Sequence, residues 1–244
     1  MIRQPLRVAL CGLALVLFMV LFASAARAQG LASTSGFGES VLLDLMPLGG
    51  GAPIDISSGP LPMVSGIAPP TADLAASLGS VKVPVSTYGN VIETGLLHVD
   101  GLSQMPFAFT SVSDALASQV IIKLIGPTSF LVVKADVASS QSLVACGSGA
   151  NPTATGTVGL TNGKINGVAF DPNPAPNTVL INQPGLRVVA NEQILTVNHF
   201  STDLVVNAIH VYVSNLPVDN VGTLTADLVV AQSHARMLLC LIPE

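Results

Sequence analysis

Apolar and polar residues alternate along most of this chain in short runs that are typical of β-strands. These runs are rich in Val, Ile, Leu, Ser and Thr, and Gly or Pro interrupts them at short intervals. The clearest are ESVLLDLM (39–46), GSVKVPVSTYG (79–89), VIETGLLHVDG (91–101), SQVIIKLIG (118–126) and SFLVVKADVASSQSLVAC (129–146). In the last run Lys134 and Asp136 alternate with apolar residues, which predicts a strand with one solvated and one buried face. The pattern therefore predicts an all-β fold.

A β-hairpin is predicted at residues 157–170, TVGLTNGKINGVAF. Asn162-Gly163 suits a two-residue turn, because Asn and Gly both tolerate positive backbone φ angles. Asn166-Gly167 competes with it as the turn, so the register is open by a few residues. The next segment, residues 171–185, contains four prolines and is predicted to be a loop with one short strand, TVLI, inside it.

The first 28 residues have the features of a cleaved signal peptide. Two arginines precede an uncharged apolar run, and Ala26 and Ala28 supply the small residues that signal peptidase requires. Cleavage is expected before Gln29. A retained membrane helix is the alternative, since the apolar run is near the minimum length that can span a bilayer. The small-residue ending favours cleavage, because a spanning helix does not need it.

The residues that follow the leader differ in composition from the rest of the chain. The segment 46–80 gathers glycines and prolines and has no long periodic run, but apolar residues still recur in it at strand spacing. This favours an extended Gly/Pro-rich arm packing on the body over a linker between domains. We therefore expect an arm at 29–80 and one antiparallel β-sandwich domain, jelly-roll-like, at 81–244.

The charge balance disfavours several classes of partner. Without the leader, six basic residues remain against fourteen acidic ones, a formal net charge of −8. Such a surface cannot neutralise a long row of phosphates, so we expect no binding to nucleic acid and none to a membrane after signal-peptide removal. The chain has no Trp and few other aromatic residues, which disfavours a flat stacking platform for polysaccharide. Exposed edge strands could pair with another copy or with other cell-surface proteins.

Two cysteines, Cys146 and Cys240, remain after the leader. In an exported protein such a pair predicts a disulfide, which would tie the middle of the chain to its last strand. Two unrelated buried thiols are the alternative. A zinc site is disfavoured, because no second cysteine or histidine lies at ligand spacing beside either residue.

His210 and His234 lie in the two apolar runs that close the chain, VNAIHVYV (206–213) and ADLVVAQSHARMLLC (226–240). If these runs pair, the two histidines could be neighbours and are the candidates for a metal site. A third ligand at diagnostic spacing is missing, so the favoured interpretation is that both are structural. His98 and His199 receive the same interpretation, and no cofactor is expected.

The sequence contains none of the G-x-S-x-G, H-E-x-x-H, phosphate-loop or EF-hand motifs. Ser233 next to His234 does not suggest a triad, because adjacent side chains of a strand point to opposite faces. A secreted ligand- or carbohydrate-binding sandwich is the first alternative, and it requires a concave polar cluster with exposed Phe and Tyr. A hydrolase of unrecognised type is the second, and it requires Ser, His and Asp converging in one cleft.

Several segments, in order along nearly all of the mature chain, resemble the choice-of-anchor P family. The segments are GFGESVLLDL, GPLP, ADVASSQSLVACGSG, LTNGKINGVAF, LTVNHF, LVVNAIHVYV and ADLVVAQSHARMLLC. This family consists of exported bacterial proteins that share one ectodomain and end in different surface-sorting signals. This sequence departs from the family pattern at its end: only LIPE follows Cys240, so we expect no C-terminal anchor. The resemblance implies an extracellular or cell-surface β domain without catalytic residues, and we expect a non-catalytic structural, adhesive or surface-interaction function.

Overall fold

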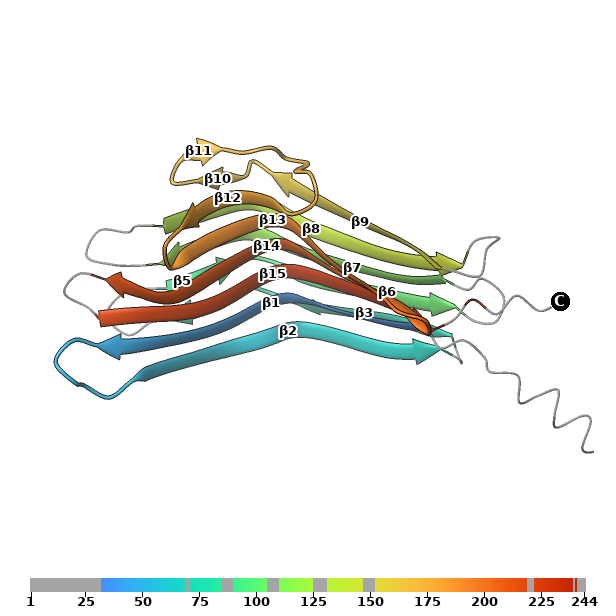
Figure 1. The fold of residues 1–244 in the computed structure, drawn as a ribbon, viewed down its shortest axis with the longest axis horizontal. Coiled ribbons are helices and arrows are strands. Elements are labelled where there is room, and N and C mark those ends of the chain that lie inside the picture. The colour runs from blue at the N-terminus through green and yellow to red at the C-terminus, as the bar shows by residue number, and fades with distance from the viewer. Residues whose placement is uncertain are drawn as a thin grey trace, which may run out of the picture.

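The computed structural model describes residues 32–68, 71–84, 90–104, 110–124, 131–146, 152–218, 222–238 and 240, which form fifteen strands and no helix (Figure 1). The signal-peptide residues, including Ala26, Ala28 and Gln29, lie outside these ranges. Among the described residues there is thus no helix long and apolar enough to cross a membrane. The strands are β1 (Ala32–Pro47), β2 (Ile54–Ala68), β3 (Ala72–Leu78), β4 (Val81–Pro84), β5 (Asn90–Thr94), β6 (Leu97–Gln104), β7 (Thr110–Leu124), β8 (Leu131–Cys146), β9 (Pro152–Thr161), β10 (Lys164–Ile165), β11 (Val168–Ala169), β12 (Thr178–Gln183), β13 (Leu186–Val197), β14 (Ser201–Val218) and β15 (Gly222–Leu238).

The strands form two antiparallel sheets, as the all-β prediction required. The six-stranded sheet has the order β12-β13-β14-β15-β1-β2. The nine-stranded sheet has the order β11-β10-β8-β7-β5-β4, with β6 also paired to β7, β3 to β6 and β9 to β8. Because β5 and β6 share the neighbour β7, and β9 and β10 share β8, each of these pairs is one strand with an interruption.

The chain connects these strands as meanders. After the β1–β2 hairpin it enters the nine-stranded sheet, passes through neighbouring strands from β3 to β11, and returns to the six-stranded sheet for β12 to β15. The last strand, β15, pairs with β1. A jelly roll needs two Greek keys, so the jelly-roll-like expectation is wrong in its connectivity. Alternation in sequence shows which side chains are buried, but it does not specify which strands pair.

Residues 32–78 form three strands that pair within the two sheets, so the expected arm packing on the body is not seen among them. β1 pairs along its whole length with β15, and β2 and β3 each pair with one strand. The proposed boundary at residue 80 falls between β3 and β4 of the same sheet. The sequence is misleading here because Gly59, with φ of 85°, and Pro60 interrupt an edge strand, where an irregular backbone is tolerated.

The predicted hairpin is present, and its turn is Asn166-Gly167, the alternative to Asn162-Gly163. β10 pairs with β11 through a turn at Asn166 and Gly167, whose φ angles are 50° and 84°. Asn162 also has a positive φ, of 52°, but it lies between β9 and β10, which both pair with β8. Asn162-Gly163 therefore interrupts one strand and does not reverse the chain.

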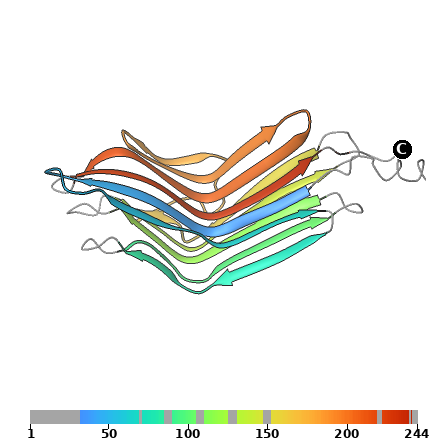
Figure 2. The same cartoon turned by 90° about the horizontal axis from the view of Figure 1, so that it is seen from below.

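Both sheets bend near the middle of their long strands (Figure 2). Residues of positive φ lie at this level in successive strands, among them Asn191 in β13, Ala231 in β15 and Gln119 in β7, and the β1–β2 register shifts between Glu39 and Val41. Each irregularity adds a residue that breaks the alternation and bends the strand. The outer face of the six-stranded sheet, meaning the face turned away from the other sheet, lies on the inside of the bend.

The interior differs on the two sides of the bend. One side is filled by large aliphatic side chains, including Leu43, Ile92, Ile122, Leu131, Ile209, Val211 and Leu228. On the other side small residues let the sheets approach so closely that hydroxyl groups of one sheet donate to backbone carbonyls of the other. These bonds are Thr34 Oγ1 to Val112 O (2.7 Å), Ser111 Oγ to Ser33 O (2.6 Å) and Ser113 Oγ to Ser35 O (2.8 Å). Such direct contact requires a spacing below the usual value of about 10 Å.

Candidate functional site

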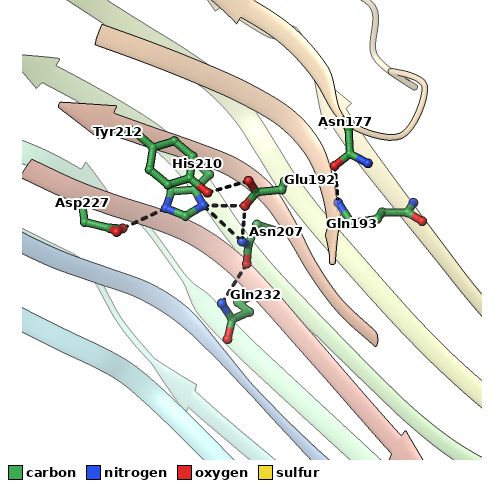
Figure 3. A network of polar contacts seen from close by, with 8 residues as sticks. All are labelled: Asn177, Glu192, Gln193, Asn207, His210, Tyr212, Asp227 and Gln232. Carbon is green, nitrogen blue, oxygen red and sulfur yellow. Dashed lines mark hydrogen bonds and ion pairs between the residues drawn. The ribbon is translucent and has the colours of Figure 1, made fainter. Parts of the chain in front are cut away.

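A polar network lies on the concave outer face of the six-stranded sheet, at the bend (Figure 3). We call it the His210 network; its members are Glu192 of β13, Asn207, His210 and Tyr212 of β14, and Asp227 and Gln232 of β15. Glu192 pairs with Asn207 and Asn207 with Gln232, so these three side chains form one row across the strands. Tyr212 pairs with Asp227 in a second row.

His210 lies between two carboxylates. Its Nδ1 is 2.5 Å from Glu192 Oε2 and its Nε2 is 2.8 Å from Asp227 Oδ1. The imidazole also stacks on the Tyr212 ring, with ring centroids 3.7 Å apart. Both ring nitrogens therefore have protein partners, and the two flanking negative charges favour a protonated imidazole.

Glu192 is the acceptor on which the network converges. Tyr212 Oη donates to its Oε1 at 2.5 Å, and Asn207 Nδ2 donates to its Oε2 at 2.8 Å. Gln232 Nε2 in turn donates to Asn207 Oδ1 at 2.8 Å. Glu192 and His210 are each 7% exposed and Asn207 is 1% exposed. These buried polar groups are bonded to one another, as their desolvation requires.

The network shifts the pKa values of its members. Burial opposes ionisation of Glu192, but hydrogen bonds from His210, Tyr212 and Asn207, together with the charge of His210, lower its pKa to about 2. Burial also opposes ionisation of His210 and by itself lowers the pKa of the imidazole. The hydrogen bonds and charges of Glu192 and Asp227 outweigh the effect of burial, so the pKa of His210 is raised overall. Burial and the bond to Glu192 raise the pKa of the Tyr212 phenol. The arrangement thus favours an ionised Glu192 beside a charged His210 and a neutral Tyr212.

The two candidate metal ligands are not brought together. His210 pairs with Val229 of β15, whereas His234 pairs with Val205 of β14, five residues before His210. The two histidines therefore lie on opposite sides of the bend, and the expectation that they could be neighbours is wrong. The described part of the chain contains no group of three or more His, Cys, Asp or Glu side chains that could hold a metal ion.

His234 belongs to a Ser–His–Asp chain of its own. Its Nδ1 is 2.9 Å from Ser35 Oγ and its Nε2 is 2.9 Å from Asp203 Oδ1. Arg236 Nε lies 3.8 Å from the other oxygen of Asp203. All four side chains project from paired strands of one sheet face. Acyl transfer needs oxyanion donors and exclusion of water as well as a nucleophile and a base, so this contact alone does not make a catalytic site.

A similar chain surrounds His98 in the nine-stranded sheet. Its Nδ1 is 2.6 Å from Ser77 Oγ and its Nε2 is 2.8 Å from Asp100 Oδ2. A depression of about 400 Å³ beside it is lined by His98 and Asp100, together with Asp114 and Gln141 of the neighbouring strands. Ser77 is not among its lining residues, so the hydroxyl that would act as the nucleophile does not face the depression.

The concave face has polar side chains but offers no free aromatic platform within the network. The Tyr212 ring stacks on His210, and the Arg187 guanidinium lies 5.8 Å from its centroid. Phe200 is exposed, but it lies in the β13–β14 connection beyond the network. Stacking on sugars requires an accessible ring face. A carbohydrate-binding sandwich was expected to have a concave polar cluster with exposed Phe and Tyr; the network supplies the polar cluster but not the exposed rings.

The predicted disulfide between Cys146 and Cys240 is confirmed. Their Cα atoms are 5.5 Å apart, and the bond joins the last residue of β8 to the chain just after β15. Because β8 and β15 belong to different sheets, the disulfide ties the two sheets together at one end.

Sequence reasoning missed Glu192 and Asn207, on which the network depends. Both interrupt apolar strand runs, VVANEQIL and LVVNAIHV, with polar residues that the alternation would place near buried positions. A charged residue inside an apolar run must have a partner if it is buried, and this is the signal that could have found them.

Comparisons with known proteins give no family for this chain. No model of a protein family matches it, and no curated protein sequence does. Among solved structures, the crystal structure of Neisserial surface protein A (NspA) shares 8% identity with this chain, covering 84% of it and 95% of its own length. The TM-score is 0.17, which is too low to indicate a shared fold, so the comparison carries no argument about function.

Proposed function

We propose that this protein is an exported, non-catalytic surface-interaction domain that acts as a structural or adhesive module outside the cell or at its surface. The disulfide supports export, because such bonds persist in oxidising compartments. The expected leader and the resemblance to the choice-of-anchor P family point the same way. The Ser–His–Asp chains are assigned a structural role, because their members are bonded to one another on open strand faces.

The observation that carries the proposed interaction is the free edge of the six-stranded sheet. Among the strands that the structure describes, β2 pairs with β1 on one side only and ends the strand order. Along this edge Leu61, Met63 and Ile67 are 41%, 59% and 60% exposed. Residues 56–68 contain no charged side chain. Exposed edge strands normally carry charges or prolines that prevent pairing with another chain; β2 has Asp55, Pro60 and Pro62, but its last six residues, 63–68, have neither.

The occupant that best fits this edge is β2 of a second copy. Without the leader the chain has a formal net charge of −8, so two copies repel unless they meet along an uncharged strip, which residues 56–68 of β2 supply. Pro60 and Pro62 lack the N–H that pairing needs, so the pairing segment is residues 63–67. With Ser65 on the two-fold axis, Met63 of one copy lies opposite Ile67 of the other, and the two sheets become continuous.

The test is the oligomeric state of the purified chain by sedimentation equilibrium over about 1–100 µM. We expect a dimer that Met63→Lys and Ile67→Lys each weaken by at least about tenfold, because a charge is placed in the pairing strip. Leu42→Lys is the matched control: Leu42 is 58% exposed on the same sheet, but it lies in β1. A monomeric wild type, or equal weakening by all three variants, would contradict pairing through β2.

A further inference from the structure

All four lysines of this acidic chain lie on one half of the outer face of the nine-stranded sheet. They are Lys82 in β4, Lys123 in β7, Lys134 in β8 and Lys164 in β10. All project from the outer face of the nine-stranded sheet, on the side of the bend that has the aliphatic interior. Their wide spacing in sequence hides this arrangement, which only the strand pairing reveals.

Three of these lysines fall in a single row across five strands. The row follows the strand pairing from Lys82 through Glu93, Ile121 and Lys134 to Lys164. It crosses four strand spacings of about 4.8 Å each and is therefore about 19 Å long. We call this set, with the adjacent Lys123, the lysine row.

Lys134 and Lys164 are directly opposite each other on neighbouring strands. Like charges in this position repel and destabilise a sheet. Both side chains are exposed, and neither forms an ion pair with another described residue. At the other end of the row Glu93 lies 4.0 Å from Lys82 and 3.5 Å from Lys123, and balances part of their charge. The uncompensated positive charge is thus concentrated at Lys134 and Lys164.

The row borders a depression in the same face. The depression has a volume of about 550 Å³, and its lining includes Lys82, Lys134, Glu93 and Gln119. Asp136 also lines it but accepts a hydrogen bond from Asn162 Nδ2 at 2.7 Å. Two ammonium groups and two carboxylates therefore line the depression, and this face has a net positive charge because Lys123 and Lys164 lie beside it.

We propose that the lysine row binds a linear acidic polysaccharide with repeated carboxylate or sulfate groups, which lies across the strands and contacts Lys134 and Lys164 most closely. This assignment rests on the proposed surface-interaction function for its setting, but it uses a different sheet from the β2 edge. A ligand that neutralises the Lys134–Lys164 repulsion releases counterions on binding, so its affinity falls as salt rises. The net acidity of the chain confines such binding to this face.

The test is binding of heparin to the purified full-length chain at about 50 mM and 200 mM salt, with neutral dextran as control. We expect salt-sensitive binding to heparin and none to dextran. Lys134→Gln with Lys164→Gln should weaken binding at least about tenfold, whereas Lys134→Arg with Lys164→Arg should retain it. The charge-matched control, Arg187→Gln with Arg236→Gln, removes two charges from the other sheet and should change the affinity less than about twofold.

Three results would overturn this proposal. They are no heparin binding at low salt, equal weakening by the arginine control, and binding to phosphatidylglycerol vesicles without binding to heparin. The Met63→Lys variant separates the two proposals, because it should lose the dimer and keep the heparin affinity of each site. A wild-type monomer that binds heparin would reject β2 pairing alone, and a dimer that does not bind heparin would reject the lysine row alone.

Discussion

Replacing Cys146 or Cys240 by serine is expected to lower the free energy of unfolding by about 4 kcal/mol. The bond closes a loop between residues 94 apart in sequence, and loop-closure entropy gives about 4–5 kcal/mol for that length. It also joins the two sheets on the side of the bend where they approach most closely. Urea denaturation followed by far-UV circular dichroism measures the change.

The two single variants and the double variant control for effects of the serine side chains. Because each removes the same bond, all three should unfold at the same urea concentration, and reduction of the wild type should reproduce the shift. Unfolding midpoints equal to that of the oxidised wild type would show that the bond contributes little to stability.

Replacing His210 by alanine is expected to cost about 3–5 kcal/mol. The substitution leaves the buried, ionised Glu192 without its charged partner. Removing one member of a buried ion pair lowers the free energy of unfolding by about 3–5 kcal/mol. His98→Ala is the matched control, because His98 also bridges two polar side chains, Ser77 and Asp100, but its side chain is 39% exposed, so its loss should cost under about 1 kcal/mol. Equal costs would contradict the role assigned to the buried network.

The pH dependence of stability gives a second readout of the same network. Glu192 has a pKa of about 2 in the folded chain against an ordinary value of 4.5, so its contribution is present above pH 4.5 and is lost as pH falls towards 2. Glu192 and Asp227 overcome the effect of burial and raise the pKa of His210 above 6.5, so its contribution is complete below pH 6.5 and is lost as pH rises through the folded value. The network therefore stabilises the fold most between about pH 4.5 and 6.5.

Other groups add to the decline on the alkaline side. Burial raises the pKa of Glu39 and of Asp114, and the stability that each contributes is also lost as pH rises through its folded value. These groups are retained in His210→Ala, so the difference between the wild-type and variant profiles isolates the His210 network. Parallel profiles would show that His210 does not change its proton affinity on folding.

The sequence was sufficient to predict strands and the disulfide, because both depend on local patterns. Alternation in Leu131–Cys146 predicted a half-buried strand, and the pair of cysteines in an exported chain predicted their bond. The bend was not predictable in this way. Ala231, Asn191 and Gln119 adopt positive φ inside long strands, and an alanine at such a position has no sequence signature.

The candidate site was only partly predictable because it depends on strand pairing. His210 was singled out from its sequence context, but its partner Glu192 lies on β13 and is brought to it by the pairing of β13 with β14. The lysine row is a stronger case, because Lys134 and Lys164 become neighbours only once β10 pairs with β8. The negative net charge of the whole chain predicted no binding to anionic ligands. A net charge sums all residues, so it does not show that the fold places the lysines together on one face.

The measurement that tests the central claim of export most directly is the intact mass of the protein from its native host, taken from culture medium and from washed cell surfaces, with and without reduction before alkylation. We expect a chain that begins at Gln29 and has two thiols that become accessible to alkylation only after reduction. Recovery from the cell surface would indicate an attached module, and recovery from the medium a free one. A mass that retains the leader, or two thiols that react without reduction, would contradict the extracellular assignment and the proposed function with it.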